Sequence, residues 1–415
     1  MLYKTLIKNN VEVENIHFPT SIMVKLTNRC NLKCIFCSQG DAMNNDIDFG
    51  TVKKLLIEAK KYGVCEVIYS GGEPLLYPKF KEVISFGKNL GLHQVLVTNG
   101  TEIDKYIDDI LSKIDSIGIS LHGNENIHDE LVSQRGAYQK VKRNIEILNH
   151  LKNITPKITI NYTMSEKNIG KLNDVIKFSS EHDCQLSVAR LNQIGRSVSN
   201  NNIQSIVDKF VNQLNTENSI HISNVIPICQ MKTDKKYLCH SCSAGIASVC
   251  IETDGGVKIC ASSSQSFGSI KDQSLFEVWN NLKFRNFRSL NWLPEVCKTC
   301  RDFSRCLGGC KVEVYENPYT YSKDCLMKQA IKEFYEKCTE NKLIFLFSNV
   351  RRIGDEFLLL GIPNRIVDKE GMDLIKTLIM NNQFNIEFNK MEKNRRKRAL
   401  ELLYGMYKDG LISFK

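Results

Sequence analysis

The cysteines of this chain constrain its fold more than any other residue type. Sixteen occur in 415 residues, and most gather near residue 30 or between residues 239 and 325. A disulfide framework belongs to an oxidising compartment, whereas clustered cysteines in a reducing one are typical of metal ligands. The sequence has no signal-peptide pattern and no apolar run near the roughly 18–20 residues of a membrane span. We therefore expect a cytoplasmic, metal-organised protein that does not enter membranes.

Strand and helix patterns alternate from Ser21 to about Arg190. Short apolar, β-rich segments are predicted strands: Ile22–Leu26, Glu66–Tyr69, Gln94–Val97, Ser116–Leu121, Lys157–Tyr162 and Gln185–Arg190. Amphipathic segments between them are predicted helices: Thr51–Lys61, Lys79–Asn89, Ala137–Leu151 and Gly170–His182. This alternation predicts an α/β fold with a parallel sheet, curled into a partial (βα)6 barrel of the TIM type. Functional residues are then expected after the carboxyl ends of the strands. Residues 200–235 are predicted to be helical and connective.

The first cysteine group is a triplet directly after the first predicted strand. Cys30, Cys34 and Cys37 have the spacing C-x3-C-x2-C. Four thiolates usually complete a four-iron cluster, so three thiolates leave one iron open for another ligand. Structural zinc is the alternative, but the loop offers no fourth Cys or His for it.

Together with the preceding segment Val24–Arg29, the triplet resembles the signature of radical S-adenosylmethionine (SAM) enzymes. The resemblance implies that Cys30, Cys34 and Cys37 are the catalytic cysteines and hold a [4Fe-4S] cluster whose open iron binds the methionine end of SAM. It also implies that Phe36 lies beside the adenine. In this family, reduction of the cluster splits SAM to give a 5′-deoxyadenosyl radical.

Further motifs stand where this family binds SAM. The turn of Gly71, Gly72, Glu73 and Pro74 is implied to bind the methionine amino group; glycines let carbonyls approach, and a carboxylate can neutralise an ammonium. The other implied SAM contacts are Thr98, Asn99, Ser120 and Arg190. An ordinary turn and a solvated salt bridge are the alternatives for the glycine motif and the arginine. Relatives usually carry Asp where this chain has His122, so the role of that residue stays open.

The second cysteine group extends over 84 residues, from Cys242 to Cys325. Cys242 is followed by twelve residues, Gly255, four more residues and Cys260. A C-x2-C-x5-C-x3-C run and, fourteen residues later, one more cysteine complete the group: Cys297, Cys300, Cys306, Cys310 and Cys325. A zinc ribbon accounts for four cysteines at most. Seven cysteines therefore indicate at least two metal centres.

This spacing is similar to that of the SPASM extension of radical SAM enzymes, which carries two auxiliary four-iron clusters. The resemblance implies that Cys242, Cys260 and Cys310 hold the inner cluster. The outer cluster is implied to use Cys297, Cys300, Cys306 and Cys325. Cys239 is the candidate for the fourth inner ligand, and an open iron is the alternative. With the cluster of the first triplet, three [4Fe-4S] clusters are expected.

The last part of the chain, from about residue 341, contains no cysteine. Apolar runs at Leu343–Phe347, Glu356–Leu360 and Arg365–Asp368 precede helix patterns at Gly371–Met380 and Arg395–Tyr407. This order resembles the small α+β, winged-helix-like (PqqD-like) element that binds leader peptides as an added strand. A helical cap is the alternative. Nucleic-acid binding through the basic run from residue 393 to 398 is a third reading, which we do not favour because such runs are usually solvated.

These patterns divide the chain into four parts. They are an N-terminal segment (1–20), a radical SAM partial barrel (21–235), a SPASM domain (236–338) and a peptide-recognition domain (339–415). The resemblance implies a maturase that modifies a short precursor peptide by a cross-link, a thioether, an oxidation or an epimerisation. A flavodoxin or ferredoxin is implied to supply the electron to this enzyme. One alternative is a sulfatase-type maturase that oxidises a Cys or Ser of a protein client. The other is a non-catalytic, cluster-bearing DNA-binding regulator.

Overall fold

The fold is described from a computed structural model of the chain. The described residues are 16–40, 44–151, 156–191, 220–223, 241–293, 297 and 303–316, and then 343–345, 349–353, 356–360, 365–368, 371–373, 375–376, 388, 391–408 and 411–414. The chain forms two compact units, Met1–Thr320 and Tyr321–Lys415. Each unit is described by itself.

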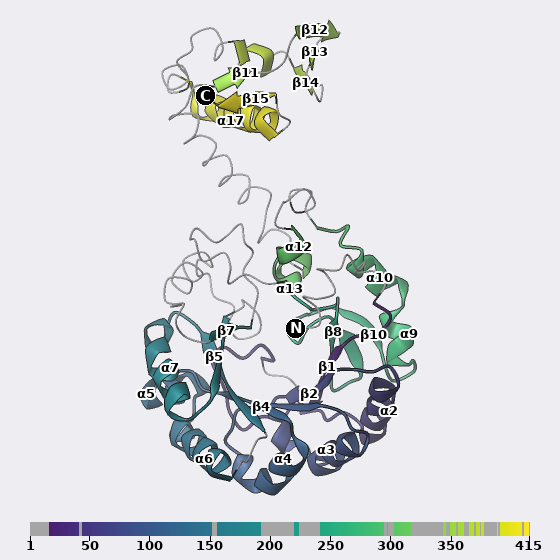
Figure 1. The fold of residues 1–415 in the computed structure, drawn as a ribbon, viewed down its shortest axis with the longest axis vertical. Coiled ribbons are helices and arrows are strands. Elements are labelled where there is room, and N and C mark those ends of the chain that lie inside the picture. Colours follow the sequence, from purple (N-terminus) through teal and green to yellow (C-terminus); the bar gives the residue numbers. More distant parts are fainter. Residues whose placement is uncertain are drawn as a thin grey trace. The chain divides into compact units, whose positions relative to one another are not determined.

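One open sheet of ten strands forms the first unit, in the order β10-β9-β8-β1-β2-β3-β4-β5-β6-β7. Its parallel core consists of β1 (Ser21–Thr27), β2 (Glu66–Gly71), β3 (Gln94–Thr98), β4 (Ser116–Ser120), β5 (Lys157–Met164), β6 (Gln185–Arg190) and β7 (Ile220–Ile222). The sheet curves, and helices cover its outer side (Figure 1). The predicted α/β partial barrel is confirmed.

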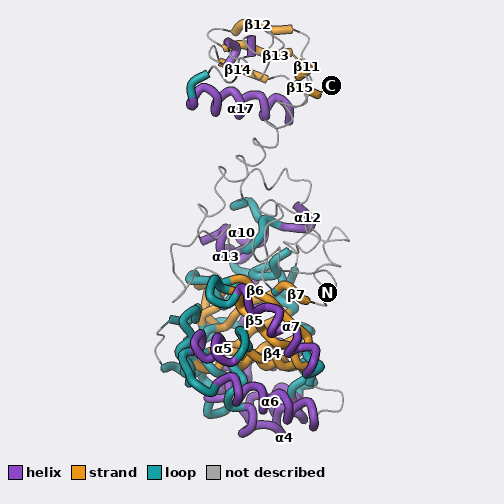
Figure 2. Tube along the Cα trace, turned by 90° about the vertical axis from the view of Figure 1, so that its left-hand side faces the viewer, coloured by secondary structure: helices purple, strands orange, loops and turns teal. Residues whose placement is uncertain are grey.

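The barrel helices are amphipathic and bury one face against the sheet. They are α2 (Phe49–Lys61), α3 (Phe80–Asn89), α4 (Ile107–Lys113), α5 (Glu125–Val132), α6 (Ala137–Leu151) and α7 (Leu172–Glu181). Helix α2 begins after Asp48, whose side chain accepts a hydrogen bond from Thr51 N, as expected of an N-cap. Its buried residues recur at helical spacing: Val52, Leu55, Leu56 and Ala59. Figure 2 shows the strands enclosed by these helices.

A hairpin-like extension continues the barrel sheet beyond β1. Its strands are β8 (Ser248–Ile251), β9 (Gly256–Lys258) and β10 (Ser266–Ser269). Strand β8 runs parallel to β1, with Ser248 opposite Ser21, and β9 and β10 follow antiparallel. The cysteine-rich segment therefore shares a sheet with the barrel. This arrangement covers the second edge of β1, whose backbone groups would otherwise lack partners in the sheet.

Short helices and aromatic side chains pack beside this extension. The helices are α9 (Leu275–Trp279), α10 (Leu282–Arg288), α12 (Phe303–Cys306) and α13 (Lys311–Glu316). Helix α9 begins with a capping box formed by Ser274 and Glu277. Trp279 is fully buried, as a core residue should be, and the Arg288 guanidinium lies 4.3 Å from its ring centroid. These contacts give the segment an apolar core of its own.

The second unit is a small α+β structure. Strands β12 (Asn349–Ile353), β13 (Glu356–Leu360) and β14 (Arg365–Asp368) form an antiparallel sheet with β13 in the centre. Strand β11 (Leu343–Phe345) pairs antiparallel with β15 (Ile412–Phe414), which follows α17 (Lys393–Lys408). Residues 371–373 and 375–376 are helical. The sequence predicted β11, β13, β14 and both helical segments, but not β12 or β15.

Candidate active site

The loop that carries Cys30, Cys34 and Cys37 leaves the carboxyl end of β1 and is held by the end of α5. The N–H groups of Lys33 and Ile35 donate to the last carbonyls of that helix, at 3.3 and 3.0 Å. Cys34 packs against a buried cluster that includes Leu32. Among the described residues none of the three thiols forms a disulfide, and Cys30 is exposed while the other two are half-buried. Accessible thiols on a loop whose backbone is held in place are suited to bind a metal cluster.

The Gly71–Gly72 turn packs directly on the backbone that leads into this loop. Gly71 has φ +148°, and a Cβ there would lie 2.2 Å from the carbonyl oxygen of Thr27. Gly72 N donates to the same carbonyl at 2.7 Å, and Glu73 N donates to the carbonyl of Arg29 at 2.7 Å. Glycine is required because no side chain fits this approach. The next residue, Pro74, begins the short helix η2 (Pro74–Leu76) and is buried.

The Glu73 carboxylate is fully buried and ties the ends of β2 and β3 together. Its Oε1 accepts from Thr98 Oγ1 at 2.7 Å and from Leu75 N at 3.1 Å, and its Oε2 accepts from Asn99 N at 2.8 Å. Burial raises the pKa of Glu73 to about 7, against the hydrogen bonds that lower it. An ammonium placed nearby would favour the ionised form. The amino-group contact of Glu73 stays a prediction.

Asn99 connects the end of β3 to the cysteine loop. Its Nδ2 donates to Asn31 Oδ1 at 2.9 Å and lies 4.0 Å from Cys30 Sγ. Asn31 Nδ2 in turn donates to Thr101 Oγ1 at 2.8 Å. The predicted SAM motifs at the ends of β1, β2 and β3 are therefore joined by direct hydrogen bonds.

Phe36 and two histidines form an aromatic wall behind the loop. The Phe36 ring meets the His122 ring edge-on at 4.7 Å between centroids, and His122 stacks on His128 of α5 at 5.7 Å. His122 Nδ1 accepts from Thr163 N at 3.2 Å, which leaves the proton of the neutral ring on Nε2. Ser120, the last residue of β4, precedes His122 by two residues and is half-buried. The structure thus gives His122 a packing role against Phe36.

The histidine pair makes the fold sensitive to acid. Burial lowers the pKa of His128 to about 4, and burial also lowers the pKa of His122. In the unfolded chain both histidines protonate near pH 6.5. The unfolded chain therefore binds more protons than the folded chain between about pH 6.5 and 4. Stability is therefore lost as the pH falls through this window, by up to about 1.4 kcal/mol per pH unit for His128, and His122 contributes a loss in the same direction.

We expect His128→Asn to flatten this dependence in the cluster-free chain. The Asn Oδ1 can replace His128 Nδ1 as acceptor for the N–H of His122, which the structure places 3.2 Å away. Thermal unfolding midpoints at about pH 6.5 and about pH 5 should fall less in the variant than in the wild type. Equal falls in the two proteins would contradict the assignment.

Three cysteines of the second group come together beside β1. Cys242 acts electrostatically on both Cys260 and Cys310. Burial raises the pKa of the Cys260 and Cys310 thiols, so a bound metal would be needed to hold them as thiolates. Lys25 of β1 donates to Glu252 Oε1 at 2.7 Å and to the carbonyl of Ala261 at 3.3 Å. That lysine connects the strand before the first triplet to the residue after Cys260.

Helix α13, which follows Cys310, is anchored by its two glutamates. Arg190 at the end of β6 donates from Nη1 to Glu313 Oε1 at 2.7 Å, and its Nη2 donates to Oε2. Glu316 Oε2 accepts from Ser264 N at 2.9 Å. The pair of Arg190 and Glu313 is buried, so the solvated salt bridge considered for this arginine is wrong. Truncating one member of such a pair typically costs about 3–5 kcal/mol.

The donor sets fit iron–sulfur clusters by their chemistry. In the described ranges, no three Cys, His, Asp or Glu side chains stand in a ready metal-binding geometry. The fit rests instead on cysteine thiols that form no disulfide among the described residues, because thiolates are the soft donors that clusters require. Cys297 is half-buried and Cys306 is buried. The predicted ligands Cys239, Cys300 and Cys325 lie outside the described residues.

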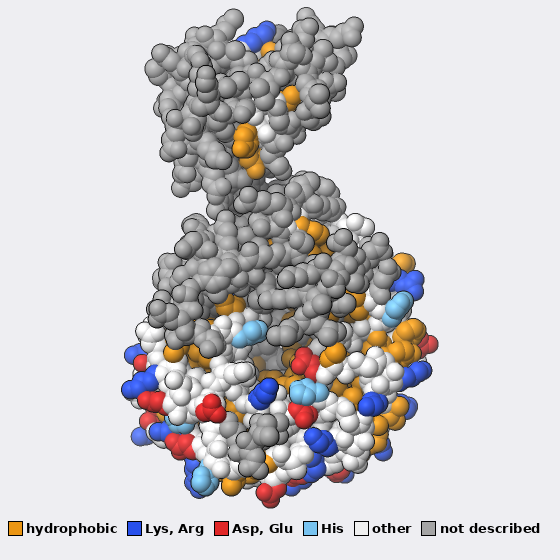
Figure 3. All heavy atoms as spheres, in the orientation of Figure 1, with side chains coloured by type: hydrophobic (Ala, Val, Ile, Leu, Met, Phe, Trp, Pro, Cys, Tyr) orange, Lys and Arg blue, Asp and Glu red, His pale blue; other side chains and the backbone are white. Residues whose placement is uncertain are grey.

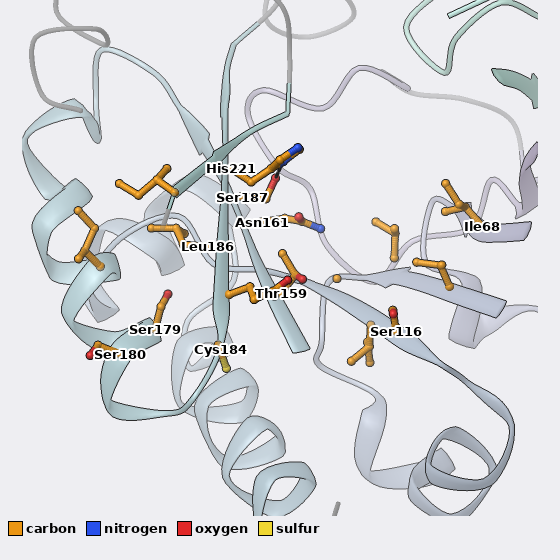
Figure 4. Close-up of a pocket in the computed structure, with 17 residues that line it drawn as sticks. Ile68, Ser116, Thr159, Asn161, Ser179, Ser180, Cys184, Leu186, Ser187 and His221 are labelled. Atoms are coloured by element: carbon orange, nitrogen blue, oxygen red, sulfur yellow. Dashed lines mark hydrogen bonds between the residues drawn. The ribbon is translucent and has the colours of Figure 1, made fainter. Parts of the chain in front are cut away.

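A cavity of about 950 Å³ lies among β2–β7 and α7, mostly toward the amino ends of the strands. Figure 4 shows Asn161, Ser187 and His221, from three neighbouring strands, lying close together there. Ser187 Oγ is 3.4 Å from His221 Nδ1. None of the described residues that line it is Asp, Glu, Lys or Arg. The cysteine loop leaves the opposite ends of the strands, and none of its three cysteines lines this cavity.

The surface of the first unit carries mixed charge. On the face shown in Figure 3, lysine and arginine side chains alternate with aspartate and glutamate. The described side chains on that face form no single-sign patch of the kind that nucleic acids favour. Across the described helices, none combines the length and apolar character of a membrane span.

Two family models match the chain. Residues 24–178 match the Radical SAM superfamily, and residues 233–301 match SPASM, an iron–sulfur cluster-binding domain. The first range runs from β1 into α7, and the second contains β8, β9 and β10 together with Cys242 and Cys260. The first cysteine triplet therefore lies inside the Radical SAM range, and the start of the second cysteine group lies inside the SPASM range.

Curated relatives and solved structures agree with these matches. The PqqA peptide cyclase of Bradyrhizobium diazoefficiens is 24% identical over 337 residues, which are 74% of this chain and 85% of that protein. The cyclase of Gluconobacter oxydans is 23% identical over 313 residues, 71% of this chain and 86% of that protein.

Among solved structures, Streptococcus suis SuiB bound to precursor peptide SuiA gives a TM-score of 0.60 at 20% identity, covering 75% of this chain and 76% of SuiB. The protein anSMEcpe with bound AdoMet and Cp18Cys peptide gives 0.56 at 21% identity, covering 76% and 98%. At these identities the structures show a shared fold.

The chain is a radical SAM enzyme with a SPASM domain. Its cofactors are S-adenosylmethionine and iron–sulfur clusters. When bound, these groups supply a reductively generated, hydrogen-abstracting radical. The protein residues described above brace the cysteine loop, close the glycine turn and attach the cysteine-rich segment to the barrel.

Several residues of this site were not predicted from the sequence. Asn31, Lys25 and Glu313 were missed because each acts through a partner at least 68 residues away in the chain. Asn31 lies inside the triplet itself, so its place in the motif was the one available signal. His128 carries no spacing signal and lies beside His122 because α5 folds back along the loop.

Proposed function

We propose that this radical SAM enzyme is a peptide maturase. Its action on a ribosomally synthesised precursor peptide would leave a cross-link, a thioether, an oxidised residue or an epimer. The observation that carries the proposal is the similarity to PqqA peptide cyclases over 74% of the chain, because a match of that extent is longer than the two matched domains together. The reductant is proposed to be a flavodoxin or ferredoxin, and the compartment the cytoplasm, since clustered thiols need reducing conditions.

Three [4Fe-4S] clusters are part of the proposal. Cys30, Cys34 and Cys37 hold the cluster that binds SAM. The inner auxiliary cluster takes Cys242, Cys260, Cys310 and Cys239, and the outer one takes Cys297, Cys300, Cys306 and Cys325. The electrostatic proximity of Cys242 to Cys260 and Cys310 supports the inner set.

The SAM contacts are assigned from the hydrogen-bonded motifs at the strand ends. Gly71 and Gly72 present backbone carbonyls to the methionine ammonium, and Glu73 holds the turn against Thr98 and Asn99. Phe36 lies against the adenine, and Pro74, Ser120 and Arg190 complete the site. The Arg190 pair with Glu313 supports a second duty for that arginine, fixing α13 to β6.

Peptide recruitment is assigned to residues 339–415. Among the described strands of the second unit, β12 and β14 each pair with one neighbour only. Such edges carry free backbone groups that can accept a peptide as an added strand. The proposed domains are 1–20, 21–235, 236–338 and 339–415, because the cysteine-rich domain must keep Cys325.

Truncation after Glu340 tests the recruiting role while leaving every proposed cluster ligand in place. We expect the full chain to bind a precursor peptide encoded beside its gene with an affinity of about 1 μM, and the truncated chain to lose at least about tenfold, or 1.4 kcal/mol. Anaerobic calorimetry measures both. Formation of 5′-deoxyadenosine without peptide should stay equal in the two chains.

Equal peptide binding by both chains would overturn the role given to residues 339–415. Absence of binding by the full chain, with oxidation of a Cys or Ser in a folded protein client, would favour the sulfatase-type maturase instead.

A further inference from the structure

Lys311 stands out as a buried cation inside the cysteine-rich segment. It is the first residue of α13, directly after Cys310, and its exposed fraction is 0%. Its Nζ donates to the carbonyl oxygen of Leu307, the residue after Cys306. The ammonium is therefore held inside the turn that joins Cys306 to Cys310.

The backbone of this turn is shaped to bring the two cysteines and the ammonium together. Leu307, Gly308 and Gly309 all have positive φ, at 48°, 81° and 83°. A leucine in the left-handed region is uncommon and marks a conformation imposed by its surroundings. The turn reverses the chain between Cys306 and α13, so the Lys311 side chain reaches back across it.

A buried ammonium requires an anion, and the described residues offer cysteines for that purpose. Burial lowers the pKa of Lys311, and the groups that act against this shift are Cys242, Cys306, Cys310 and Cys297. The nearest carboxylate in sequence, Glu313, accepts hydrogen bonds from both terminal nitrogens, Nη1 and Nη2, of the Arg190 guanidinium. A buried charge with only a neutral carbonyl as partner is costly, whereas thiolates of an anionic cluster compensate it.

The four cysteines belong to different clusters in the assignment proposed above. Cys242 and Cys310 are inner-cluster ligands, and Cys297 and Cys306 are outer-cluster ligands. We propose that the Lys311 ammonium is a countercharge shared by the two auxiliary clusters, which sets the potentials at which both accept an electron. This inference rests on the proposed ligand sets.

The direction of the effect follows from electrostatics. A one-electron reduction makes each cluster more negative, and a nearby positive charge in a poorly polarisable interior stabilises that reduced form. Lys311 therefore raises both midpoint potentials. It acts through the clusters and contacts no substrate in this role.

The test is a potentiometric titration with dithionite, followed by electron paramagnetic resonance. The full chain carries Ala at Cys30, Cys34 and Cys37, so that only the auxiliary clusters report. Lys311→Met and Lys311→Gln remove the charge, and the glutamine keeps a donor for Leu307. We expect each to lower both midpoint potentials by at least tenfold in the reduction equilibrium, which is about 59 mV for one electron.

Two matched variants separate charge from packing. Lys311→Arg keeps the charge and should keep the wild-type potentials. Arg288→Met removes another buried cation of the same segment, one that lies over Trp279, and should leave both potentials unchanged. Loss of clusters from the Met and Gln variants, with retention in the Arg variant, would support the countercharge equally.

Three results would overturn the inference. Unchanged potentials in a cluster-loaded Gln variant would show that the charge does not matter, and a shift of one potential alone would show that it is not shared. Iron and sulfide contents that leave the unsubstituted chain without auxiliary clusters would refute the ligand sets themselves. That last result is distinguishable because it is seen before any change at Lys311.

Discussion

Replacing Cys30, Cys34 and Cys37 together by Ala abolishes the formation of 5′-deoxyadenosine from SAM. The three thiols are exposed or half-buried on a loop whose backbone is held by the end of α5, so their loss costs the barrel little packing. Loss of a partner that only orients a metal ligand costs about 10–100-fold, and loss of the ligands themselves exceeds that. Chromatography of the products after anaerobic reduction measures the effect.

Cys65→Ala is the matched control for the triplet. Cys65 is an exposed free thiol just before β2, outside both predicted cysteine groups. The control should keep wild-type 5′-deoxyadenosine formation and thermal stability. Persistent SAM cleavage in the triple variant would exclude the triplet as the cluster site and would leave the non-catalytic regulator as the reading to pursue.

Gly71→Ala has the second largest expected effect, because it strikes the turn on which the SAM site is built. The new Cβ would lie 2.2 Å from the carbonyl oxygen of Thr27, and that backbone atom cannot move without disturbing the end of β1. Overpacking costs about 1–3 kcal/mol. The φ of +148° adds backbone strain of about 1–3 kcal/mol. Binding of SAM should fall by tenfold or more, since about 1.4 kcal/mol suffices for that.

Gly170→Ala serves as the control for this substitution. Gly170 lies in the short helix η4 (Ile169–Lys171), its φ is not positive, and a Cβ there meets nothing within 4 Å. Isothermal titration with SAM and a thermal melt should leave this variant close to the wild type. A Gly71→Ala protein with wild-type SAM affinity would refute the close approach of the turn to β1.

The barrel was predictable because its signals are local. Each strand from β1 to β6 is a short apolar run, and the predicted SAM motifs stand at the ends of β1, β2, β3, β4 and β6. Helices α4 and α5 were not predicted because both are short, with 7 and 8 residues. Strand β7, in a stretch predicted to be helical and connective, has three residues and exists through its pairing with β6.

The contacts between segments that are far apart in the sequence could not be predicted from residue spacing. The pairing of β8 with β1 brings the cysteine-rich segment onto the barrel sheet, and no pattern in residues 248–251 announces a parallel partner 227 residues earlier. The partner of Arg190 lies 123 residues later, on a helix that the sequence did not single out. Such contacts depend on the complete fold, whereas cysteine spacing survives as a local signature of chemistry.

The most direct test of peptide maturation is the mass of the precursor peptide after anaerobic incubation with the full enzyme, SAM and reductant. A peptide maturase should produce a defined mass change on one peptide residue or residue pair, together with 5′-deoxyadenosine. The variant with Ala at all three triplet cysteines should produce neither. If 5′-deoxyadenosine is formed while the peptide is bound but returns unchanged in mass and stereochemistry, the proposal of a peptide maturase is contradicted.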